Sequence, residues 1–98
     1  MEKKKLGPSD TISEPCEASV AYRCPCCDFK TLHGRGAFEI CPVCYWEDDG
    51  QDQHNADLVR GGPNGVLSLT EAQKNFREFG ASDPKFTTDV RKPFHEEL

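Results

Sequence analysis

The sequence contains little apolar material and no long apolar run. Only 36% of its 98 residues are hydrophobic and 9% are aromatic, with a single Trp. No stretch approaches the roughly 20 consecutive apolar residues that a membrane-spanning helix needs, so we expect a soluble protein without a membrane segment. A chain of this length forms one domain at most and buries a small share of its surface, which favours a metal or covalent staple.

The N-terminus lacks the apolar segment of a secretory signal peptide. It opens with a basic cluster in MEKKKLGPSDTISEPCEAS, but no hydrophobic region follows. We therefore expect a cytoplasmic, reducing environment, where cysteines bind metal or carry out redox chemistry more often than they form structural disulfides. Residues 1–21 hold few large aliphatic side chains and are predicted to be a flexible tail.

An excess of positive charge is also absent. The chain has 12 Lys and Arg against 17 Asp and Glu, a formal net charge of −5. A negative protein repels a phosphate backbone, which disfavours nucleic-acid binding. A nucleic-acid-binding zinc ribbon stays an alternative only if the basic residues gather on one face; these are Lys3, Lys4, Lys5, Arg60, Arg91 and Lys92.

Cysteine, by contrast, is plentiful, and four of the six cysteines form two CxxC pairs. Thirteen residues separate the pairs, and proline follows the first cysteine of each. Two residues between thiolates let a tight turn aim both sulfurs at one ion. We predict a tetrahedral site that is closed to water and therefore structural, with zinc as the metal and iron as the alternative. Its ligands are Cys24, Cys27, Cys41 and Cys44.

Two other uses of the cysteine pairs fit the sequence less well. Disulfides within each CxxC would close only very short loops and would add little stability. A thioredoxin-like redox pair is expected beside a βαβ unit, for which the chain has no room.

The remaining cysteines have no partner at metal-ligand spacing. Cys26 is predicted to be a spare thiol at the tip of the first turn, because pairing with Cys24 would leave one residue between ligands, too few for the turn. Its alternatives are a small buried filler or a reactive thiol beside Arg23 and the metal. Cys16, in the predicted tail, is expected to be incidental.

Glycines and an alternating pattern predict a two-stranded hairpin between the cysteine pairs. Gly34 and Gly36 permit a tight turn in HGRG, after the segment DFKTL, and Phe38 and Ile40 alternate with their neighbours as in a half-buried strand. The expected fold is a small metal-stabilised α+β domain: a zinc ribbon, meaning a hairpin over about residues 22–45 with two cysteine knuckles, then a loop and one packed helix.

The helix is predicted over about residues 69–79. Ser68 and Glu71 fit a capping box, and Gly80 is the natural stop. An apolar stripe that ends in Phe76 and Phe79 is expected to dock on the hairpin or on a partner. The following segment, broken by two prolines, is expected to be extended and to lie over the domain through Phe86, Val90 and Phe94.

Several stretches together resemble one known family. YRCPCCDFKTL, GAFEICPVCYWEDDGQD, VRGGPNGVLSLTEAQKNFREFGAS and VRKPFHEE are similar to the cysteine-rich CPCC family of small bacterial proteins. The resemblance implies a zinc-binding domain over residues 22–96 and no particular activity. Because Cys26 belongs to the family motif, the resemblance does not by itself select the four ligands.

An acidic segment follows the second cysteine pair: Glu47, Asp48, Asp49, Asp52, His54 and Asp57. It does not match the EF-hand loop, and a solvated loop is the simplest interpretation. The same segment is our candidate surface for a protein partner. We therefore predict a non-enzymatic, zinc-stabilised protein-binding module; the alternative is an enzyme that uses thiol chemistry at Cys26 or acid–base chemistry at His54.

Overall fold

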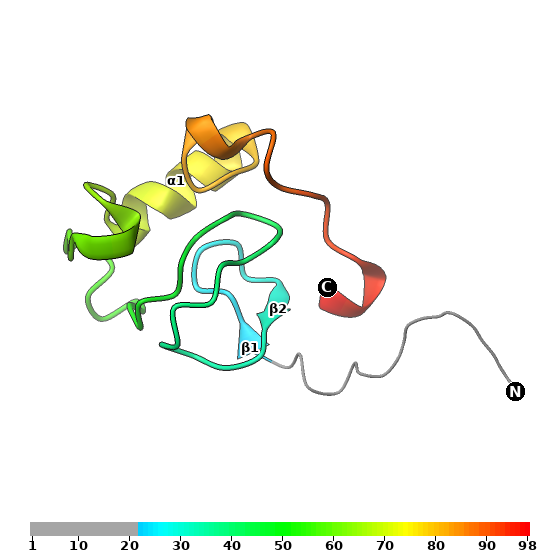
Figure 1. The fold of residues 1–98 in the computed structure, drawn as a ribbon, viewed down its shortest axis with the longest axis horizontal. Helices are drawn as coiled ribbons and strands as arrows, with labels where there is room; N and C mark the ends of the chain where they lie inside the picture. The colour runs from blue at the N-terminus through cyan, green and yellow to red at the C-terminus, as the bar shows by residue number, and fades with distance from the viewer. Residues whose placement is uncertain (1–21) are drawn as a thin grey trace, which may run out of the picture.

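The computed structural model describes residues 22–98, which contain a short hairpin and one helix (Figure 1). The tail predicted for residues 1–21, with Cys16 and the basic cluster Lys3 to Lys5, lies outside the described residues. Strands β1 (Tyr22–Arg23) and β2 (Lys30–Leu32) are antiparallel. Three short 3-10 turns, η2 (Gly62–Asn64), η3 (Pro84–Phe86) and η4 (His95–Glu97), accompany helix α1 (Leu69–Phe79). Within this part of the chain no helix is both long and apolar enough to cross a membrane.

The hairpin encloses the first cysteine pair instead of joining the two pairs. Tyr22 pairs with Leu32 and Arg23 with Lys30, so the DFKTL segment folds back on the residues before Cys24. The hairpin predicted between the pairs is wrong, because Phe38 adopts a left-handed φ of 61° that breaks the expected strand and leaves its ring mostly exposed. Each CxxC turn closes its own hairpin, and such local closure costs less chain entropy than pairing across the longer loop.

Helix α1 begins and ends with strong local signals. The Ser68 side chain accepts a hydrogen bond from the Glu71 N–H at 3.0 Å, and Gly80 closes the helix in the left-handed conformation at φ 83°. Leu69 and Ala72 are fully buried. Phe76 packs edge-on against Phe29, with ring centroids 6.3 Å apart, and thereby joins the helix to the first knuckle.

The apolar core is small and lies around the cysteines. Trp46 is its largest member and is fully buried together with Leu32, Leu69 and Val43. The helix and the chain after it are hydrogen-bonded directly to the knuckles, since Gln73 Nε2 donates to the Pro25 carbonyl at 2.8 Å and the Ser82 N–H donates to the Cys44 carbonyl at 2.7 Å. The four clustered cysteines and the rest of the core therefore form one packed unit.

The C-terminal segment returns to the second knuckle and to the hairpin. The Arg91 N–H donates to the Pro42 carbonyl at 3.1 Å, and the Arg91 guanidinium forms a bidentate ion pair with Glu97 at 2.8 and 2.9 Å. The same guanidinium lies 3.7 Å from the centroid of the Phe94 ring, and η4 contacts β2. Residues 87–98, which we call the C-terminal strap, thus lie over the domain.

The Arg91–Glu97 pair should make stability depend on acid pH. Burial raises the pKa of Glu97, but hydrogen bonds from Arg91 and the Phe94 N–H outweigh burial, so the pKa is lowered overall. A lowered folded pKa adds stability that is fully present above the unfolded value of about 4.3 and is lost as pH falls through the folded pKa. We expect Glu97→Gln to reduce the free energy of unfolding at neutral pH by about 1–3 kcal/mol.

Urea unfolding followed by the fluorescence of buried Trp46, from neutral pH down to about pH 3, measures this dependence. The difference between wild type and Glu97→Gln should shrink as pH falls below about 4.3 and through the lowered folded pKa, because Glu97 of the wild type then becomes neutral, as Gln is at every pH. Glu96→Gln, which changes the exposed neighbouring residue, is the control and should behave like wild type. Any loss of metal in acid would affect this control and the wild type equally. A pH-independent deficit in Glu97→Gln would contradict the assignment.

Candidate metal centre

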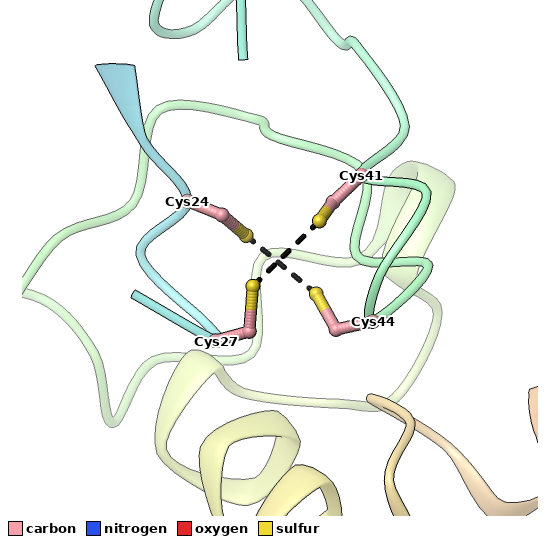
Figure 2. Close-up of side chains that lie close together, drawn as sticks. All are labelled: Cys24, Cys27, Cys41 and Cys44. Carbon is pink, nitrogen blue, oxygen red and sulfur yellow. Dashed lines mark hydrogen bonds between the residues drawn. The ribbon is translucent and has the colours of Figure 1, made fainter. Parts of the chain in front are cut away.

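Four cysteine sulfurs converge on one point (Figure 2). The Sγ atoms of Cys24, Cys27, Cys41 and Cys44 all lie within 4.8 Å of one another. Cys24 and Cys44 are 3.5 Å apart, and Cys27 and Cys41 are 3.7 Å apart. A tetrahedral zinc with Zn–S bonds near 2.3 Å requires sulfur–sulfur distances of about 3.8 Å. The observed arrangement therefore fits a four-thiolate metal site.

The two knuckles have the same backbone geometry, residue for residue. The Cys24 N–H donates to the Phe29 carbonyl, and the Cys41 N–H donates to the Trp46 carbonyl, each at 2.9 Å. The residue after each second cysteine is left-handed, with φ 68° at Asp28 and 72° at Tyr45.

This conformation suits Asp28 but is uncommon for a bulky residue such as Tyr45. The Tyr45 ring packs on Phe86 with a centroid separation of 4.6 Å. The CPxC spacing thus encodes one turn twice, and the two turns face each other.

The site is closed to solvent. Cys24, Cys41 and Cys44 are fully buried, and Cys27 retains only 8% of its surface. Four protein sulfurs complete the tetrahedron and leave no open position for a water or substrate. Such a centre can stabilise a fold but cannot activate a bound water.

Electrostatics explains why a cation suits the site. The pKa of Cys41 is lowered, because the thiols of Cys24, Cys27 and Cys44 and the Thr31 hydroxyl hydrogen-bond to its sulfur. The pKa values of Cys27 and Cys44 are raised, in each case first by the hydrogen bond with Cys24. Neighbouring thiolates repel one another, so all four would ionise together only around a metal ion, which would lower the pKa of each coordinating thiol.

Cys41 also has donors from outside the cysteine cluster. The Thr31 hydroxyl lies 3.0 Å from its sulfur, and the Val43 N–H donates to the sulfur at 3.4 Å. Such second-layer hydrogen bonds orient a ligand and spread its negative charge. Sequence reasoning missed Thr31; its position beside Leu32, on a strand that touches the core, was the available signal.

Cys26 lies outside the group of four. It is 7% exposed and belongs to the same apolar core cluster as Cys27 and Val43. The structure thus places the spare thiol inside the core, as a small filler, and not at an exposed turn tip. This burial leaves little access for a substrate to react with the thiol.

The acidic segment is only partly a surface feature. Asp48 is fully buried, its carboxylate 2.8 Å from Arg35 Nε, and it also accepts hydrogen bonds from the N–H groups of Gly36 and Gly50. The expectation that Asp48 contributes to a partner surface is therefore corrected. It holds the loop before the second knuckle against the loop after it.

The rest of the segment lies nearer to solvent. Asp52, His54 and Asp57 are exposed, whereas Glu47 and Asp49 are half-buried. Buried Gln51 fixes this loop by donating through Nε2 to the carbonyls of Asn55 and Leu58, each at 2.8 Å. Asp57 accepts from the Thr70 hydroxyl at 2.6 Å, which ties the loop to α1.

The GGPNG stretch has a structural role that the sequence analysis did not identify. The Asn64 side chain donates to the Glu47 carbonyl at 2.7 Å and accepts from the Glu47 N–H at 3.2 Å, as a neighbouring strand would. The left-handed glycines around Asn64 allow this approach. The available sequence signal was an asparagine in a glycine-rich turn, where its side chain can form hydrogen bonds with the backbone of another segment.

Three of the basic residues named from the sequence lie in the described part of the chain. Arg91 is paired with Glu97, while Arg60 and Lys92 are exposed.

Comparison with known proteins gives one match. The family model described as Cysteine-rich CPCC matches residues 22–97, nearly the whole region that the structure describes. Neither the curated proteins nor the solved structures contain a match.

Proposed function

We propose that this chain, which belongs to the cysteine-rich CPCC family, is a zinc ribbon whose structural Zn²⁺ supports a non-enzymatic protein-binding module. The closed four-sulfur cluster carries the proposal, because a buried tetrathiolate suits Zn²⁺ and leaves no catalytic position. A metal ion there would crosslink the two knuckles and supply folding energy that the small core lacks. All five described cysteines are free, which supports a reducing, cytoplasmic setting.

Iron is the rival metal for four thiolates. The purified chain should be colourless and should contain one zinc ion by elemental analysis. Strong visible absorption together with bound iron would instead assign the site to iron.

The exposed part of the acidic segment is our candidate partner surface. Asp52 and Asp57 are exposed, and half-buried Asp49 lies beside them, on a loop that Gln51 and Asp48 hold in place. A rigid scaffold with a fixed charged loop is a common design for recognition, and its charge complements a basic protein. The enzyme alternatives are weaker: the Cys26 thiol is buried, and His54 lines neither of the cavities in the described residues that adjoin α1 and η2.

The triple variant Asp49→Asn, Asp52→Asn and Asp57→Asn tests this surface. Asn keeps an acceptor oxygen for the local hydrogen bonds and removes only the charge. We expect capture of a basic partner from a lysate of the source cells, quantified by mass spectrometry, to fall about tenfold or more, which corresponds to at least 1.4 kcal/mol.

A matched control removes the same charge elsewhere. The control variant combines Glu71→Gln, Glu78→Gln and Glu96→Gln. The three glutamates are exposed and lie outside the acidic segment. This control should capture the partner as wild type does. Unchanged partners for the loop variant would reject the acidic segment while leaving the metal proposal intact.

A further inference from the structure

An apolar groove lies between α1, the knuckles and the C-terminal strap. Its volume is about 480 Å³, and its apolar wall includes Phe29, Val43, Phe76, Phe79 and Val90. This volume falls in the range of sites that hold small molecules or side chains of a partner.

Phe79 shows that the groove is incompletely filled. The last member of the helical stripe was expected to pack, as Phe76 does against Phe29, yet 50% of Phe79 is exposed. Aromatic side chains left open beside an apolar wall are typical anchors for a partner. The apolar stripe of α1 therefore packs on the domain through Phe76, whereas Phe79 stays available for contact with another molecule.

The charge of the groove indicates what it binds. Its only charged lining residues are Arg91 and Lys92, both basic, although the whole chain carries a net charge of −5. Arg91 is neutralised by Glu97, whereas Lys92 is exposed and forms no ion pair within residues 22–98. An occupant with apolar side chains and a carboxylate that meets Lys92 complements both properties.

We propose that this groove docks a segment of another protein that carries aliphatic or aromatic anchors next to Asp or Glu. This inference goes beyond the proposed function, because it uses a surface separate from the acidic segment and of opposite charge. A second copy of the chain is a less suitable occupant, since a contact between two different surfaces of identical chains propagates unless it closes into a ring.

The groove is also coupled to the metal centre. Val43 lies between the ligands Cys41 and Cys44, and Phe29 follows Cys27 by two residues. Docking should therefore require the metal-loaded fold, and chelation should abolish it.

Selection of short random peptides displayed on phage, against the zinc-loaded full chain, tests the proposal. We expect enriched peptides to combine Phe, Leu or Ile with Asp or Glu, and to shift the amide NMR signals of Phe79, Val90 and Lys92. In fluorescence anisotropy with a synthetic selected peptide, Lys92→Glu and Phe79→Ser should each weaken binding about tenfold or more. Lys74→Glu reverses an exposed charge on α1 outside the groove and should bind as wild type.

Three results would overturn the proposal. The first is selection that enriches no peptides, or peptides without acidic residues. The second is binding that Lys92→Glu and Phe79→Ser leave unchanged although both variants retain their metal. The third is concentration-dependent self-association that Phe79→Ser removes, which would assign the groove to a second copy. None of these outcomes bears on the acidic segment or on the metal content.

Discussion

Replacing Cys27 with serine is expected to release the metal and unfold the chain. A serine oxygen is a poor substitute for a thiolate, so the tetrahedron loses one of its four ligands. Structural zinc contributes about 10–16 kcal/mol of apparent binding free energy in small zinc domains, comparable to or above the whole stability of a typical domain. Elemental analysis and the fluorescence of the fully buried Trp46 measure the two effects directly.

Cys26→Ser is the matched control, one residue away and with the same chemical change. Cys26 is buried but lies outside the four-sulfur group, so the variant should keep its metal and its fold. Its cost should be about 1 kcal/mol, the ordinary effect of a polar atom placed at a small buried site. If Cys26→Ser loses metal while Cys27→Ser retains it, the ligand assignment is wrong.

Sequence reasoning succeeded where the determining interactions are local. CPxC spacing identified both knuckles, because the turn that aims two sulfurs at one point spans only a few residues. Helix α1 was equally local, since the Ser68 cap and the Gly80 stop lie at its own ends. In both cases the residues that define the element also belong to it.

The strand pairing and the acidic segment failed for the opposite reason. Whether β2 pairs backward to Tyr22 or forward to Phe38 depends on the left-handed φ at Phe38, which no sequence pattern announces. Asp48 looked like its exposed neighbours, but its partner Arg35 lies 13 residues away across the second knuckle. Such contacts depend on how the two knuckles pack against each other. A run of acidic residues in the sequence therefore does not reveal which carboxylate is buried and which are solvated.

Asp48→Ala should therefore destabilise the chain far more than substitution of an acid beside it. The carboxylate is fully buried and accepts hydrogen bonds from Arg35, Gly36 and Gly50. The Arg35 side chain is 34% exposed and can be rehydrated, so the cost comes mainly from the Gly36 and Gly50 N–H groups, which lose a charged acceptor, and amounts to about 2–3 kcal/mol. Urea unfolding of the zinc-loaded protein, followed by Trp46 fluorescence, gives the change in the free energy of unfolding.

Asp52→Ala is the control for loss of an acidic side chain from the same segment. Asp52 is exposed, and its carboxylate makes only a local hydrogen bond with the His54 N–H, so its removal should cost about 1 kcal/mol or less. Asp48→Asn, which keeps shape and one acceptor oxygen, should fall between the two. Equal effects of Asp48→Ala and Asp52→Ala would mean that the Arg35 pair contributes no net stability and that zinc alone holds the loops on either side of the second knuckle together.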